Sequence, residues 1–272
     1  MLSLLKEKSK FVYKETLKIH QISPSTRIAS SLSCVEILTS LYYGGLINFN
    51  PNNLFDDDRD RVIISKGHGS ISLYPILADL GFFPMTELIN VGKEGSFLGT
   101  IPDPTIPGYE TVNGSLGHGL GVGAGISIAL KKQDKSSNVI VLCGDGEMYE
   151  GSNWEAIMFS AEHKLDNLIL IIDLNKVSML DFTKNIINLK PLAQKFEIFG
   201  WDVVEIINGH DIYEVYSKLK ITIESKNKKP KVVIVNTIKG HGITELENNP
   251  LSHIISLTKD RVEEIIKGLE NE

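Results

Sequence analysis

Residues 138–156 read NVIVLCGDGEMYEGSNWEA and decide how the chain folds. The segment starts with an apolar run, turns at the Gly-Asp-Gly of 144–146 and continues into a sequence that predicts a helix over 152–163. A second apolar run, LILIID, follows at 168–173. This order of strand, turn, helix and strand is typical of a parallel sheet with helical crossovers.

The same alternation continues in both directions along the chain. Toward the N-terminus, the sequence predicts a helix over 2–22, a second helix with Ser33 as its N-cap, a strand at 61–65 and a helix over 70–81. The other predicted elements are a long loop at 85–113, helices at 115–131, 190–198, 211–224 and 258–270, and strands at 201–206 and 231–236. We therefore predict an α/β fold with a parallel sheet flanked by helices on both faces.

Composition excludes several classes of protein. The 272 residues are 42% hydrophobic and 23% charged, as in ordinary globular enzymes, and the net charge of −6 gives no support for nucleic-acid or membrane binding. No apolar run approaches the roughly 20 residues that cross a bilayer. The N-terminal residues lack the pattern of a signal peptide, and Cys34 and Cys143 both lie in apolar contexts. We expect a cytoplasmic protein without disulfides.

The Gly-Asp-Gly turn predicts a site for phosphate and metal. Glycines between a strand and a helix let the backbone approach a phosphate, and the helix N-terminus offers free N–H groups. Asn175 follows the next strand, thirty positions after Asp145. Because successive parallel strands end side by side, these two side chains are expected to meet around one magnesium ion that bridges a diphosphate. The alternative is a tight turn capped by Asp145 and an unrelated loop asparagine.

Gly-Asp-Gly followed about thirty residues later by asparagine is the thiamine diphosphate motif, and this version resembles the N-terminal, diphosphate-binding half of transketolases. The likeness covers about residues 15–265. It includes SLSCVEIL, RVIISKGHGSISLY, IPGYETVNGSLGHGL, HKLDNLILIIDLN, FGWDVVEIINGHD and KGHGITELENNPLSH. The resemblance implies a thiamine-diphosphate-binding fold, with residues 1–272 as a single diphosphate-binding domain. It also implies thiamine diphosphate and Mg²⁺, or Ca²⁺ or Mn²⁺ in its place, as cofactors.

The resemblance also assigns the metal and diphosphate ligands. Asp145, Asn175 and the backbone carbonyl of Val177 should bind the metal. Gly144 and Gly146 should lie against the diphosphate.

The other assigned residues surround the reacting part of the cofactor. His68 should contact the diphosphate near the reacting carbon, and Gly114 and Leu116 should approach the aminopyrimidine through their backbone. Glu150 should lie at an interface that links two cofactor sites, and His253 is a candidate acid or base near the substrate. Three alternatives stay open: His68 next to a helix N-cap, His253 in a solvated loop, and Glu150 as a partner of a helix dipole.

The resemblance further implies that half of the active site is on another chain. In transketolases, the glutamate that faces the aminopyrimidine comes from a pyrimidine-binding domain, which we expect on a C-terminal transketolase-like partner subunit. The chain alone should be inactive, and the active form should be a heterotetramer acting on small-molecule substrates.

The implied reaction is transfer of a two-carbon unit to an aldehyde or ketone. The alternatives are a non-catalytic cofactor-binding scaffold and a component of a decarboxylating 2-oxo-acid dehydrogenase. That component shares the Gly-Asp-Gly and asparagine motif but lacks the SKGHG and GSLGHGL segments found here.

Two positions depart from the transketolase pattern. Arg27 and Ile101 stand where the family carries histidines that bind sugar hydroxyls. A buried hydroxyl without a partner costs about 1–3 kcal/mol, so Ile101 favours a donor that ends in a methyl group. Arg27 is a fixed cation suited to carboxylate or phosphate. These changes favour an acyloin-forming decarboxylase or ligase that uses a 2-oxo acid such as pyruvate. Drift of the two loops is the alternative.

Overall fold

The computed structural model describes residues 1–112 and 114–270. Its described strands form one sheet in the order β1-β2-β3-β5-β4, and every neighbouring pair is parallel. The strands are β1 (Arg61–Ile64), β2 (Val139–Gly144), β3 (Leu168–Leu174), β4 (Asp202–Ile206) and β5 (Lys231–Asn236). The predicted parallel sheet and all five predicted strands are confirmed.

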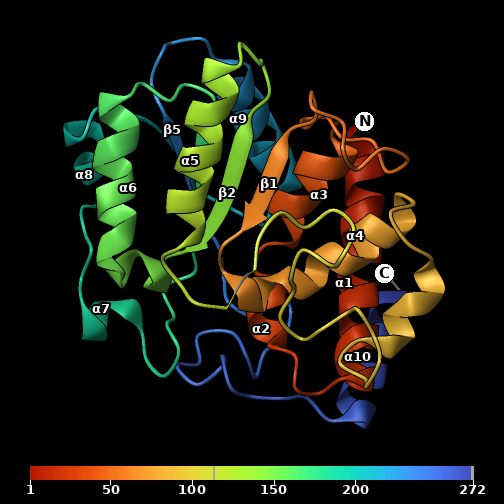
Figure 1. Cartoon of the computed structure of the whole chain (residues 1–272). Coiled ribbons are helices and arrows are strands. Elements are labelled where there is room, and N and C mark those ends of the chain that lie inside the picture. The colour runs from red at the N-terminus through yellow and green to blue at the C-terminus, as the bar shows by residue number, and fades with distance from the viewer. Residues whose placement is uncertain (113, 271–272) are drawn as a thin grey trace.

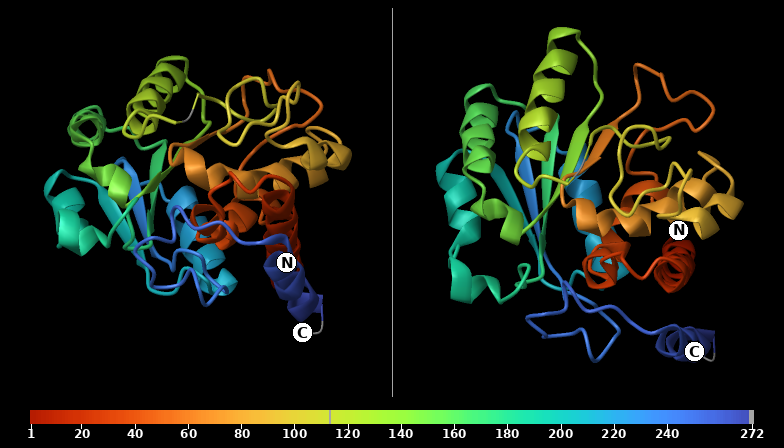
Figure 2. Two further views of the ribbon diagram at one scale, coloured as in Figure 1. Left: turned by 90° about the horizontal axis from the view of Figure 1, so that it is seen from below. Right: turned by 60° about the horizontal axis from the view of Figure 1, so that its bottom comes forward.

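Alternation along the strands divides the apolar residues between two cores. In β2, Val139 and Val141 belong to one core, whereas Ile140 and Leu142 belong to the other. The first core is covered by α5 (Gly119–Lys132), α6 (Gly151–Glu162) and α8 (Leu192–Ile198). The second is covered by α1 (Leu2–Ile22), α3 (Val35–Tyr43), α4 (Leu73–Asp79) and α9 (Ile212–Glu224). Figures 1 and 2 show these two helical layers on opposite faces of the sheet, which confirms the predicted architecture.

The remaining elements are short or peripheral. They are α2 (Ile28–Leu32), η1 (Gly67–Ser72), η2 (Met85–Asn90), η3 (Gly146–Tyr149), α7 (Thr183–Ile186) and α10 (Lys259–Glu270). Helix α10 packs against α1, so the two ends of the described chain lie close together (Figure 2). None of the helices in the described ranges is long and apolar enough to cross a membrane.

Two local predictions were wrong. Ser33 does not cap a helix: α3 begins at Val35 with Cys34 as N-cap, and the Ser33 hydroxyl instead donates to Asp173 Oδ2 at 2.6 Å. A hydrogen bond to a buried carboxylate is stronger than one to a neutral group, which accounts for this choice. The predicted loop 85–113 begins with the 3₁₀ helix η2, in which the buried Leu88 anchors the turn against the core.

Candidate active site

The carboxyl ends of β2 and β3 bring the predicted metal ligands together. Asp145 follows β2, and its carboxylate accepts hydrogen bonds from the backbone N–H of Gly146 at 2.9 Å and of Lys176 at 2.7 Å. Asn175 follows β3, and its side-chain oxygen accepts the backbone N–H of Val177 at 3.1 Å. The hydrogen bond from Lys176 therefore joins the turn after β2 to the segment that carries Asn175.

A cavity of about 800 Å³ opens at this edge of the sheet. Its lining includes Asp145, Asn175, Val177 and Lys239, and it continues along residues 188–194 at the start of α8. A volume of this size is within the range of small-molecule and cofactor sites. The predicted metal ligands thus border an open space rather than the packed core.

The chemistry of these groups fits a hard divalent cation. A carboxylate, an amide oxygen and a backbone carbonyl are the oxygen ligands that magnesium and calcium prefer. Burial, together with the neighbouring charge of Asp173, raises the pKa of the Asp145 carboxyl to about 7, so a cation beside it would compensate that charge. Within the described residues, no cluster of three or more His, Cys, Asp or Glu side chains forms a metal site. The predicted ligand set includes only one such side chain.

Lys239 is a site residue that was not predicted from the sequence. Its ammonium group donates to the backbone carbonyls of Val177 at 2.9 Å and Ser178 at 3.0 Å. Burial, followed by repulsion from Lys66, lowers the pKa of Lys239 to about 8. The signal that could have identified it is a lysine three positions after the apolar strand at 231–236, at the same carboxyl edge as Asn175.

Glu147 is a second residue that was not predicted. It is 2% exposed, and its carboxylate accepts hydrogen bonds from the Ser65 hydroxyl and from the backbone N–H groups of Gly117 at 3.0 Å and Gly144 at 3.2 Å. Glu147 therefore ties the glycine-rich loop before α5 to the ends of β1 and β2. Its position immediately after the Gly-Asp-Gly turn is the sequence signal that pointed to it.

His68 and His253 form a second cluster. Their ring centroids lie 5.0 Å apart, and Ser30 Oγ lies 3.2 Å from His253 Nδ1. Among the described residues, His253 Nε2 has no hydrogen-bond partner although it is buried. Burial and the nearby charge of Lys239 lower the pKa of His253 to about 3, and burial and Arg27 lower the pKa of His68. Both imidazoles are therefore neutral near pH 7, and His253 is half-buried rather than solvated.

The remaining predicted residues lie on adjoining loops. A Cβ atom on Gly114 would lie 3.6 Å from Ile101 Cγ2, and one on Gly117 would lie 2.5 Å from Glu150 Cβ. Glu150 is the exposed N-cap residue of α6 without a side-chain cap bond, and Leu116 is 41% exposed. The structure thus separates the predicted site into two groups. The metal-ligand group lines the cavity, whereas the histidines and the 101 and 114–117 loops do not.

The family model described as the thiamine diphosphate binding domain of transketolase matches residues 21–271. The chain belongs to the transketolase family. This transketolase-family chain is 42% identical to one of the named subunits of apulose-4-phosphate transketolase from Actinobacillus succinogenes, over 98% of this chain and 96% of that protein. It is 35% identical to a 6-deoxy-6-sulfo-D-fructose transketolase subunit of a Clostridium species, over 90% of this chain and 88% of that protein.

Longer transketolases match over part of their length. The chain is 34% identical to human transketolase and spans 41% of that protein. The crystal structure of Campylobacter jejuni transketolase superimposes with a TM-score of 0.87 at 28% identity, covering 100% of this chain and 47% of that one. The predicted fold and the predicted likeness to N-terminal subunits of two-chain transketolases are therefore confirmed.

Proposed function

We propose that this chain holds thiamine diphosphate and a divalent metal, and that with a partner subunit it transfers a two-carbon unit to an aldehyde or ketone. The observation that carries the proposal is the meeting of Asp145 and Asn175 at the ends of neighbouring strands, in a chain of the thiamine-diphosphate-binding family. The relatives named as transketolase subunits support the same reaction class.

In this proposal, each group of site residues has a separate task. Asp145, Asn175 and the Val177 carbonyl hold the metal, and Gly144 and Gly146 leave room for the diphosphate. Thiamine diphosphate, when bound, supplies a nucleophilic ring carbon and accepts the negative charge left on the transferred fragment.

His68 and His253 lie on the substrate side in this proposal. A neutral imidazole both donates and accepts a hydrogen bond, so the two rings can bind a substrate hydroxyl and pass a proton to or from it. Ser30 holds the ring of His253 in place through its Nδ1 atom. Leu116 and Gly114 then present their backbone to the aminopyrimidine, and Glu150 links this site to a second one across an interface.

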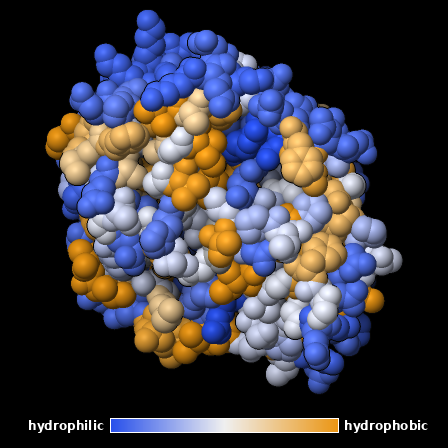
Figure 3. All heavy atoms as spheres, in the orientation of Figure 1, coloured by the Kyte–Doolittle hydropathy of each residue, from blue (hydrophilic) through white to orange (hydrophobic). Residues whose placement is uncertain are grey.

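The exposed apolar face of α5 and α6 supports a partner subunit. Val122 on α5 is 43% exposed, and Met158 and Phe159 on α6 are 49% and 42% exposed. Figure 3 shows apolar side chains gathered over this part of the surface. We propose that a C-terminal transketolase-like subunit with the pyrimidine-binding domain contacts this face, that two such pairs form a heterotetramer, and that the complex is cytoplasmic.

The donor proposal rests on Arg27 and Ile101. The Arg27 guanidinium is half-buried and makes no hydrogen bond or ion pair within the described part of the chain, while its charge acts on His68 and His253. Ile101 presents an alkyl group beside Gly114. We propose that these residues favour a methyl-ended donor with a carboxylate, such as a 2-oxo acid.

Co-expression with a transketolase-like C-terminal subunit tests the proposed function. We expect the purified chain alone to show no turnover with thiamine diphosphate and Mg²⁺, and the complex to transfer a two-carbon unit. Val122→Lys should weaken assembly in size-exclusion chromatography, whereas Ile221→Lys, at an exposed position on α9, should not. Turnover by the isolated, homogeneous chain would contradict the proposal, and a complex without turnover would favour the scaffold alternative.

A further inference from the structure

The buried carboxylate of Asp173 is a junction between four segments. It lies near the end of β3 with 0% exposure and accepts hydrogen bonds from the Lys66 ammonium and the Thr237 hydroxyl. It also accepts the Ser33 hydroxyl at 2.6 Å and the Asn175 side-chain amide at 3.0 Å. These donors come from the loops that follow β1, β3 and β5 and from the segment between α2 and α3.

The contact with Asn175 determines which way its amide points. A carboxylate only accepts hydrogen bonds, so the NH₂ end of Asn175 must face Asp173 and the oxygen must face away. That oxygen accepts the Val177 backbone N–H at 3.1 Å and keeps a second lone pair. We propose that Asp173 is a positioning residue that orients the Asn175 oxygen toward the metal, an inference that rests on the proposed metal site.

Lys66 extends the same junction to the loop of His68. Its ammonium also donates to the backbone carbonyl of Ser30 at 3.0 Å and to Ser33 Oγ at 3.2 Å. Lys66 is 7% exposed and lies two residues before His68, while Ser30 contacts the His253 ring. Asp173 therefore connects the metal-ligand group of the site to the histidine group. This geometry makes Asp173 the shared support of both.

The test must separate positioning from simple stabilisation. Removing only one partner leaves a buried unpaired charge and destabilises the fold, whereas replacing a buried ion pair by apolar residues of similar volume is often neutral. The main variant is therefore Lys66→Met with Asp173→Leu. Its matched control is Lys131→Met with Asp166→Leu, which removes the Lys131–Asp166 ion pair at the opposite end of β3.

Binding of Mn²⁺ in the presence of thiamine diphosphate is measured by electron paramagnetic resonance on the full chain, with thermal unfolding in parallel. We expect the main variant to keep its unfolding temperature within a few degrees but to bind Mn²⁺ about 10- to 100-fold more weakly, as residues behind metal ligands usually do. The control double variant should bind like the wild type. Wild-type affinity in the folded main variant would overturn the inference.

A second readout needs no metal. The side-chain amide protons of Asn175 should exchange slowly with solvent in the wild type and at least tenfold faster in the main variant, measured by NMR with Asn175→Ala to assign the signal. If the leucine variant does not fold, Lys66→Met with Asp173→Ala is measured instead. Equal exchange rates would overturn the inference, whereas a wild type that binds no Mn²⁺ while its exchange rates differ would contradict only the proposed metal site.

Discussion

Lys239 donates a hydrogen bond to the backbone carbonyl of Val177 at 2.9 Å, and that carbonyl is the predicted third ligand of the metal. Lys239 and a divalent cation therefore interact with the same oxygen. Two positive charges this close repel each other, and the repulsion is strong because the site is largely buried. Metal binding should require the ammonium group to move toward a negative group, for which the cofactor's diphosphate is suited.

Lys239→Met should therefore tighten the binding of free Mn²⁺ by about tenfold, because it removes a competing cation, and tenfold corresponds to about 1.4 kcal/mol. Mn²⁺ titration without thiamine diphosphate, followed by electron paramagnetic resonance, measures this. The matched control is Lys231→Met: Lys231 is also buried and donates to a backbone carbonyl, that of Asp166, at 2.9 Å and at the opposite edge of the sheet. Unchanged or weaker binding in Lys239→Met would show that the two cations do not compete.

Asp145→Ala should abolish metal-dependent cofactor binding while leaving the fold intact. Asp145 supplies the only negatively charged ligand of the predicted set, so its loss should weaken binding of thiamine diphosphate with Mg²⁺ by more than about a hundredfold, or about 2.7 kcal/mol. Calorimetry measures the affinity, and circular dichroism checks the fold. Asp166→Ala, remote from the site, serves as the control. Unaltered affinity in Asp145→Ala would remove the basis of the proposed function.

His20 should make the stability of the chain depend on pH. Its Nε2 atom accepts the backbone N–H of Leu257 at 3.1 Å, and Nδ1 contacts Thr26 Oγ1 at 2.8 Å, so the folded protein holds a neutral imidazole. Burial lowers the pKa of His20 from 6.5 to about 4. Between these values the unfolded chain binds the extra proton, so the free energy of unfolding should fall as the pH drops from about 6.5 toward 4.

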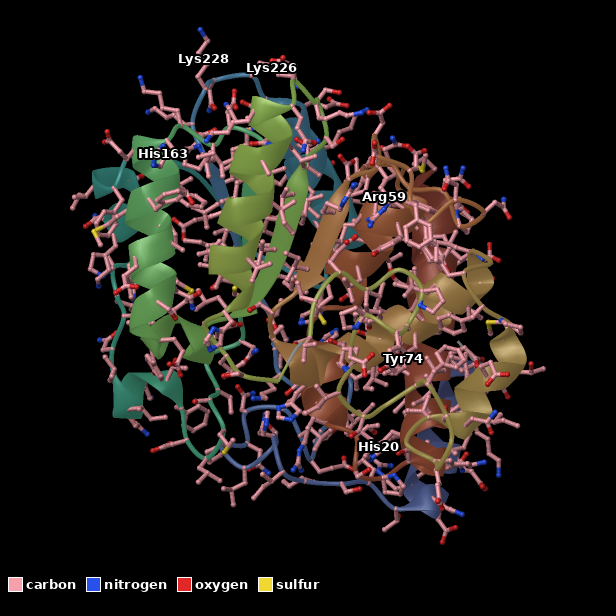
Figure 4. The ribbon with its side chains drawn as sticks, in the orientation of Figure 1. His20, Arg59, Tyr74, His163, Lys226 and Lys228 are labelled. Carbon is pink, nitrogen blue, oxygen red and sulfur yellow. The ribbon has the colours of Figure 1, made fainter. Side chains whose placement is uncertain are left out.

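The expected loss from this single group is about 2–3 kcal/mol at pH 4.5. Denaturant unfolding of the wild type and of His20→Gln between pH 7.5 and 4.5 measures it, and the difference between the two proteins should shrink at low pH. His163→Gln is the control, because His163 lies exposed at the C-cap of α6; both histidines are labelled in Figure 4. Parallel pH profiles of wild type and His20→Gln would contradict the prediction.

Ile101→His should change which donor the assembled complex prefers. An alkyl wall leaves a hydroxymethyl group unpaired at a cost of about 1–3 kcal/mol, which corresponds to a roughly five- to hundredfold preference for pyruvate over hydroxypyruvate and xylulose 5-phosphate. The variant should reduce this ratio. Steady-state kinetics with the three donors decide the matter. A wild type that prefers hydroxylated donors would return the enzyme to ordinary ketol transfer.

The sequence alone was sufficient for the elements of the sheet and for the metal-ligand group. Strand periodicity is local, so the runs at 138–143 and 168–173 could be recognised without any knowledge of the partners. The ends of adjacent parallel strands meet at one edge, so Asp145 and Asn175 could be paired from their positions after those runs. The resemblance to transketolases added His68 and His253, which the structure brings within ring contact.

Only the tertiary structure revealed the residues that support this site. Asp173 ends an apolar run and was read as part of a strand, but its partners Lys66 and Ser33 lie 107 and 140 positions away. The misassigned cap at Ser33 has the same origin, because a local capping rule ignores a distant buried carboxylate. Glu147 and Lys239 were missed because their hydrogen bonds go to backbone groups of other loops. Periodicity and motif spacing describe neighbours along the chain, whereas a buried charge takes its partners from whichever segments the fold places around it, since leaving it unpaired is too costly.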